Sequence, residues 1–181
     1  MTNLATNIQS EFIINKKKSA IFVQGLSKEV KEYEIQELLN DLNIFCLKIP
    51  KDANRNNFGY AIISFNNLKE AEEAIKILRY KKFHNKTLRV SWFNRSIFRE
   101  REKDSDFNIF LKNLNKTISL EELDKEFQKY GDIISSKIQE DEEGESLGYG
   151  FIQYYQKENV TKAIEEKNGK NWKDKKLYAG K

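Results

Sequence analysis

The chain has 181 residues, of which 39% are apolar and 33% are charged, a composition typical of folded globular proteins. Its 32 basic and 28 acidic side chains leave a net charge of +4, which permits a polyanionic partner without requiring one. The apolar runs are too short to span a bilayer, and the N-terminus has no signal-peptide pattern. We therefore expect an intracellular protein with no membrane partner.

Catalysis and metal binding have little support in the sequence. His84 and Cys46 are the single histidine and the single cysteine, so the usual zinc ligands cannot be assembled. No Gly-rich phosphate loop ends in lysine and a hydroxyl residue. We expect a protein that is not an enzyme and that needs no metal and no cofactor. Cys46, inside the apolar run IFCLKI, is predicted to be a small buried side chain.

Apolar periodicity in the first half predicts the element order βαββαβ. The pattern alternates in strands and follows the 3.6-residue repeat in helices. The predicted elements are a strand at 19–26, a helix at 29–42, strands at 44–49 and 58–65, a helix at 67–78 and a strand at 87–92.

The same element order returns in the second half. The predicted elements are a strand at 107–114, a helix at 119–130, strands at 133–138 and 148–155, a helix through Val160 and Ala163, and a strand at 176–180. Ser119 and Glu122 have the spacing of a capping box, which predicts the start of the first of these helices. The halves match along their whole length, which indicates a duplicated unit.

This repeated order predicts an α+β protein with two ferredoxin-like βαββαβ domains. Each domain would have a four-stranded antiparallel sheet backed by two helices, with the other sheet face open. We assign residues 1–18 to a flexible N-terminal tail, 19–92 to the first repeat, 93–106 to a linker and 107–181 to the second repeat.

Aromatic side chains are predicted on both open faces, because successive side chains of a strand point to opposite sides. If Ile109 and Leu111 pack under the helices, Phe110 faces outward, and Phe22 does so in the first repeat. Tyr60, Tyr149 and Phe151 follow on the third strands by the same alternation. Exposed aromatic clusters need a partner, and unpaired bases offer flat apolar faces that stack on such rings.

Four segments carry a family resemblance. IFVQGL and IFLKNL resemble the RNP2 hexamer of the RNA-recognition motif, and FGYAIISF and LGYGFIQY resemble its RNP1 octamer. The chain is more closely similar to the first two RNA-recognition motifs of cytoplasmic poly(A)-binding proteins, through LRVSWFNR, NIFLKNLNKTIS, EFQKYGDIISSKI, LGYGF and KAIEEKNG.

This resemblance implies binding of single-stranded RNA, with poly(A) favoured, and a cytoplasmic or nuclear location. It also implies a translation-initiation scaffold protein as a partner on the helices of the second repeat. The RNA-contacting residues that it implies are Phe22, Gln24, Tyr60, Ile62, Trp92, Asn94, Arg95, Arg99, Asn108, Phe110, Lys112, Tyr149 and Phe151. Ile62 stands where the family usually has an aromatic residue, which predicts a weaker platform in the first repeat. Alternation from Leu88 and Val90 would turn Trp92 inward unless the strand ends before it.

Two alternatives remain open on the sequence alone. The first is a reader of U-rich or other single-stranded mRNA or pre-mRNA sequences, because stacking on an aromatic ring does not by itself distinguish bases. The second is a protein-interaction scaffold, in which polypeptide covers the aromatic faces of the two sheets.

Overall fold

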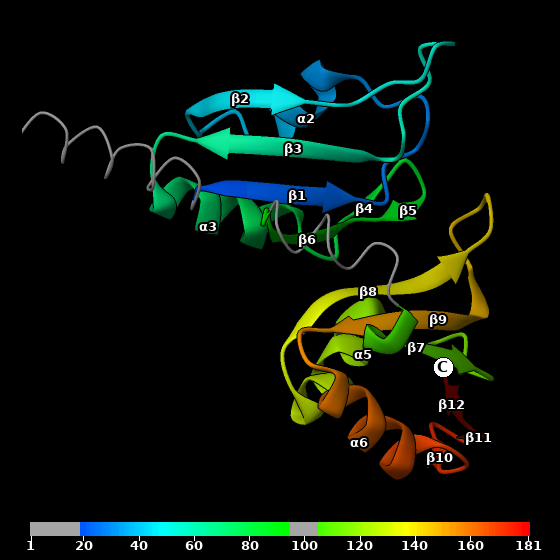
Figure 1. The fold of residues 1–181 in the computed structure, drawn as a ribbon. Helices are drawn as coiled ribbons and strands as arrows, with labels where there is room; N and C mark the ends of the chain where they lie inside the picture. Colours follow the sequence, from blue (N-terminus) through cyan, green and yellow to red (C-terminus); the bar gives the residue numbers. More distant parts are fainter. Residues whose placement is uncertain (1–18, 95–104) are drawn as a thin grey trace, which may run out of the picture. The chain divides into compact units, whose positions relative to one another are not determined.

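The computed structural model describes residues 19–94 and 105–181, and the chain divides into two compact units, 1–95 and 96–181 (Figure 1). We call the described residues 19–94 module one and residues 105–181 module two. The predicted tail, 1–18, and most of the predicted linker lie outside the described residues.

Both modules have the predicted four-stranded antiparallel sheet and two main helices (Figure 1). Module one contains β1 (Ala20–Gln24), α2 (Glu32–Leu38), β2 (Ile44–Lys48), β3 (Tyr60–Phe65), α3 (Leu68–Leu78) and β6 (Arg89–Trp92). Module two contains a 3-10 turn η1 (Ser105–Phe107), β7 (Asn108–Lys112), α5 (Leu120–Phe127), a second 3-10 turn η2 (Gln128–Tyr130), β8 (Ile133–Glu140), β9 (Ser146–Tyr154), α6 (Lys157–Lys167) and β12 (Tyr178–Gly180).

Strand order places the first and third strands of each repeat at the centre of its sheet. The order is β2-β3-β1-β6 in module one and β12-β7-β9-β8 in module two. The registers pair Phe22 with Ile62 and Phe110 with Phe151. Paired residues share a face, so the two central strands of each sheet present their outward side chains together.

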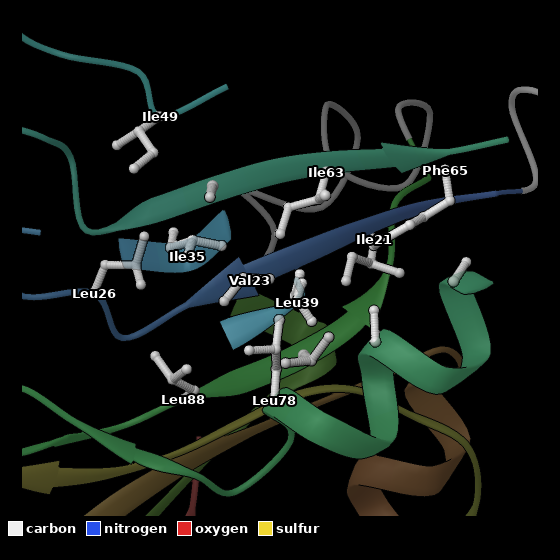
Figure 2. Packing of buried hydrophobic residues seen from close by; sticks show 14 of the residues in the cluster. Ile21, Val23, Leu26, Ile35, Leu39, Ile49, Ile63, Phe65, Leu78 and Leu88 are labelled. Carbon is white, nitrogen blue, oxygen red and sulfur yellow. The ribbon is translucent and has the colours of Figure 1, made fainter. Parts of the chain in front are cut away.

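The hydrophobic core of module one lies between the sheet and helices α2 and α3. Figure 2 shows Ile21, Val23 and Ile63 pointing from the sheet into this core, and all three are almost fully buried. Ala71 and Ala74 of α3 are also fully buried, and their small side chains allow close approach of helix and sheet. The packed side of the sheet is therefore the one that alternation predicted.

Helix α5 begins as the sequence predicts. The Ser119 hydroxyl accepts a hydrogen bond from the Glu122 amide at 3.2 Å, and the Glu122 carboxylate accepts one from the Ser119 amide at 2.9 Å. This confirms the capping box. Residues 44–48, 68–78 and 89–92 also lie within predicted elements.

Two short hairpins were not predicted. β4 (Lys82–Phe83) pairs with β5 (Lys86–Thr87), and β10 (Asn171–Trp172) pairs with β11 (Lys175–Lys176). Both turn residues have positive φ in each hairpin: 49° and 59° at His84 and Asn85, and 48° and 63° at Lys173 and Asp174. Such two-residue turns favour Asn-Gly or Asp-Gly, and neither dipeptide is present at these turns.

The Tyr154 hydroxyl anchors the core of module two. Tyr154, at the end of β9, is fully buried, and its hydroxyl donates a 2.7 Å hydrogen bond to the backbone carbonyl of Phe127. Burial raises the pKa of this phenol far above its usual value near 10. The hydroxyl therefore remains a donor across the neutral pH range and ties the end of α5 to the sheet.

We expect Tyr154→Phe to lower the free energy of unfolding of module two by about 1 to 2 kcal/mol, because it leaves a buried carbonyl without this donor. Urea unfolding can be followed through Trp172 fluorescence in a Trp92→Phe background, since these are the two tryptophans of the chain. Tyr155→Phe, at a position that is 36% exposed, is the matched control. Equal stability of the two variants would contradict this role.

Asp106 joins the start of module two to two other elements. Its carboxylate accepts hydrogen bonds at 3.1 Å from Lys181, after β12, and from Lys157, at the start of α6. These two hydrogen bonds, with that of Lys181 the larger cause, lower the pKa of Asp106 from its usual value of 3.8. A lowered carboxyl pKa contributes stability above the unfolded-state pKa that is lost as pH falls through the folded-state pKa.

Asp106→Asn should therefore lower the melting temperature of module two at pH 6 to 7, and the difference from the unsubstituted protein should shrink below about pH 4. Thermal unfolding measured from pH 7 to pH 3 checks this. A difference that is constant over the whole range would show that the ionised carboxylate is not what stabilises the module.

Candidate nucleic-acid interface

Three aromatic rings form a continuous cluster on the open face of module two, the sheet side away from α5 and α6. The ring centroids of Phe110 on β7 and Phe151 on β9 are 4.9 Å apart, with 24° between the ring planes. The Tyr149 ring is 6.0 Å from Phe110 and meets it edge-on at 76°. Phe151 is 42% exposed, so the cluster presents apolar ring surface to solvent.

Lys112 holds a positive charge beside this cluster. Its Nζ lies 5.1 Å from the centroid of Phe110 and 5.7 Å from that of Tyr178, which faces Lys112 across the β7–β12 pair. An ammonium group is attracted to the faces of aromatic rings, so both rings favour this position. The two rings therefore hold the ammonium group beside the aromatic cluster.

Tyr178 was not among the residues inferred from the sequence. It is 45% exposed on β12, while its neighbours Leu177 and Ala179 are buried. The alternation used for the other strands predicts this outward position, but the family motifs do not include it. Module two thus has four rings on its open face.

Polar side chains lie farther along the same face. Asn108 on β7 is paired with Gln153 on β9, and both are half-buried. Their amide groups carry both donors and acceptors, which is what the polar edge of a base requires. Lys137 of β8 lies opposite Phe151 and adds a second cation on this face.

The open face of module one is arranged differently. The Phe22 and Tyr60 rings lie 5.2 Å apart at 54°, and Ile62 stands opposite Phe22 where module two has Phe151. Phe22 is only 7% exposed, whereas the sequence predicted an exposed ring. Phe22 lies on the face that was predicted, and the rings of Tyr60 and of Phe93, at 6.4 Å, lie on either side of it. Phe58, 61% exposed, extends the surface beyond Tyr60.

Trp92 is not brought together with the rings of the open face. It pairs with Ile21, a core residue, so the register directs it toward the helix side, although its side chain is 41% exposed at the strand end. Gln24 does lie on the open face, between its partners Tyr60 and Arg89. Asn94 is exposed just beyond β6, and Arg95 and Arg99 lie outside the described residues.

Cys46 is exposed, so the prediction that it is buried was wrong. The pairing of β2 with β3 shifts between Ile44 and Cys46, where Phe45 is an extra residue. Without this bulge Cys46 would share the packed face with Ile44, and the inserted residue reverses it to the open side.

Within 19–94 and 105–181, no group of three or more histidine, cysteine or acidic side chains could hold a metal ion. Among the helices of those segments, none is long and apolar enough to cross a membrane.

Comparison with known proteins places this geometry in a family. The RNA recognition motif matches residues 21–89 and again residues 109–178. The chain belongs to the RNA recognition motif family. Modules one and two are therefore two consecutive RNA recognition motifs, as the four RNP-like segments predicted, and members of this family bind RNA.

Individual relatives agree with this assignment. Polyadenylate-binding protein 2 of Arabidopsis thaliana is 32% identical over 164 residues, which is 90% of this chain and 26% of that protein. The chain thus spans about a quarter of the length of this relative. A structure of an Sxl-lethal protein/RNA complex is 27% identical with a TM-score of 0.57 and covers 90% of this chain and 98% of that one.

A third likeness concerns the fold alone. The RNA-binding domain of Hrp1 in complex with RNA is 20% identical, with a TM-score of 0.67 and coverage of 92% of this chain and 97% of that one.

Proposed function

We propose that this protein binds single-stranded RNA on the open faces of both RNA recognition motifs, and that adenine-rich RNA such as poly(A) is its preferred ligand. The observation that carries the proposal is the ring cluster of Phe110, Tyr149 and Phe151, with centroids 4.9 to 6.4 Å apart. Rings at this spacing can take successive unpaired bases, whereas a duplex keeps the faces of its bases stacked on one another.

Adenine preference rests on the relatives and on the polar groups beside the rings. The 32% identical relative is a polyadenylate-binding protein. Asn108, Gln153 and the exposed Asn94 supply amide groups that can pair with the N6 donor and ring-nitrogen acceptors of adenine. Gln24 and Lys112 are the corresponding polar groups at the other end of β1 and β7.

The remaining residues inferred from the sequence belong to the same proposal. Tyr60 and Ile62 line module one beside the buried Phe22. Trp92, the last residue of β6, and Arg95 and Arg99, which follow that strand in the sequence, would also contact RNA. The family resemblance also supports a translation-initiation scaffold protein as a partner on α5 and α6, and a cytoplasmic or nuclear location. Co-precipitation and fractionation from cells test these two points.

Fluorescence anisotropy titration with A, U, C and G oligomers of equal length tests the base preference. We expect the A oligomer to bind about 5- to 150-fold more tightly than the others, because a base whose edge leaves one polar group of the protein unpaired costs about 1 to 3 kcal/mol. Preference for U would favour the second candidate, a reader of U-rich mRNA. Equal affinity for all four would remove the adenine claim and leave RNA binding intact.

The ring cluster is tested by Phe110→Ala combined with Tyr149→Ala. Loss of two stacks should weaken RNA binding by roughly 2 to 6 kcal/mol. Tyr33→Ala is the control, since Tyr33 lies on α2, is 60% exposed, and is not on a sheet face. Wild-type affinity in the double variant would contradict the proposal, and absence of RNA binding by the unsubstituted protein would favour the protein-interaction scaffold.

A further inference from the structure

The two open faces can be compared position by position, because their strands pair in the same way. Phe22 and Phe110 occupy the same central position, as do Tyr60 and Tyr149 on the neighbouring strand. The position opposite the central ring differs, since it holds Ile62 in module one and Phe151 in module two. Module one therefore lacks the ring that stacks on the central phenylalanine in module two.

Phe93 lies on the opposite side of Phe22 from Ile62. The backbone N–H of Phe93 donates a 2.9 Å hydrogen bond to the carbonyl of Ala20, which continues the β1–β6 pairing one residue past Trp92. Because Ser91 faces Phe22, alternation returns Phe93 to the same open face. Its ring centroid is 6.4 Å from that of Phe22, with 44° between the planes.

The neighbours of Phe93 on the open face are small residues, namely Ala20 and Ser91. Phe22 is 7% exposed, whereas Phe93 and Tyr60 are both half-buried. The accessible aromatic surface of module one is thus supplied by rings that flank Phe22 and are supported by it.

We propose that Phe93 is a base-stacking residue of module one and replaces the ring that is absent at Ile62. The inference rests on the proposed function, because it assigns a further contact to the same RNA-binding face. A base on Phe93 extends the site of module one beyond the end of β6, toward the segment that leads into module two. Tyr60 and Phe93 then receive bases on either side of a buried Phe22.

The test is anisotropy titration of the full chain with an A oligomer long enough for both modules. Phe93→Ala should weaken binding about 5- to 150-fold, the range that corresponds to loss of one stacked base. Phe93→Leu keeps an apolar side chain against Phe22 but removes the flat ring, so it should show a loss of the same order. Tyr60→Ala provides the comparison for a stacking position of the proposed function, and Tyr33→Ala is the control away from the sheet.

The results distinguish failure of the proposed role of Phe93 from failure of the proposed RNA binding on which it rests. If the unsubstituted protein does not bind the oligomer, the proposed function fails. If it binds, and Tyr60→Ala weakens binding while Phe93→Ala does not, Phe93 is not a stacking residue. Wild-type affinity of Phe93→Leu would also overturn the proposal, because it would show that Phe93 acts only by packing on Phe22. Thermal unfolding of each variant identifies any loss that comes from unfolding.

Discussion

Each strand of the two sheets places some side chains in the core and others on the open face, because successive side chains point to opposite faces. In β7, Ile109 and Leu111 are fully buried against the helices, while Phe110 between them lies on the open face. Burial of the packed side chains stabilises the module, so the positions of the intervening residues are set by the core. A shift of one residue in register would expose the core and bury the rings. The face on which the aromatic residues lie is therefore fixed by the packing of the core.

The two modules differ in where the aromatic rings lie on their open faces. Module two gathers Phe110, Tyr149 and Phe151 on its central strands and places Lys112 between Phe110 and Tyr178. Module one has an aliphatic residue on β3 and carries its additional ring, Phe93, past the end of β6. Both arrangements give a central phenylalanine with aromatic neighbours. They differ in where a stacked strand would find exposed ring surface, and this difference supports unequal contributions of the modules to binding.

Sequence patterns predicted much of this structure because the responsible interactions are local. Alternation identified the packed and open faces, and the Ser119 capping box identified the start of α5. Alternation also directed Trp92 inward, in agreement with its pairing to Ile21, while the family resemblance favoured it as a contact. Local patterns did not predict the low exposure of Phe22, because exposure depends on residues that are distant in the sequence, and the rings beside Phe22 are Tyr60 on β3 and Phe93 after β6.

Departures from regular geometry were also missed. The extra residue Phe45 changes the face of Cys46, and no residue type in that segment signals a bulge. The short hairpins at 82–87 and 171–176 turn through residues at positive φ without glycine, so the usual turn signal is absent. The RNA contacts inferred from the sequence, Arg95 and Arg99 among them, remain predictions.

RNA should contact the open sheet faces of this protein and not its helices. Amide chemical shifts of the isotopically labelled chain, followed during titration with a single-stranded A oligomer, test it most directly. We expect large changes on β1, β3, β7 and β9 and at Phe93, with little change on α3 and α6. Changes confined to the helices, with the central strands unaffected, would contradict it.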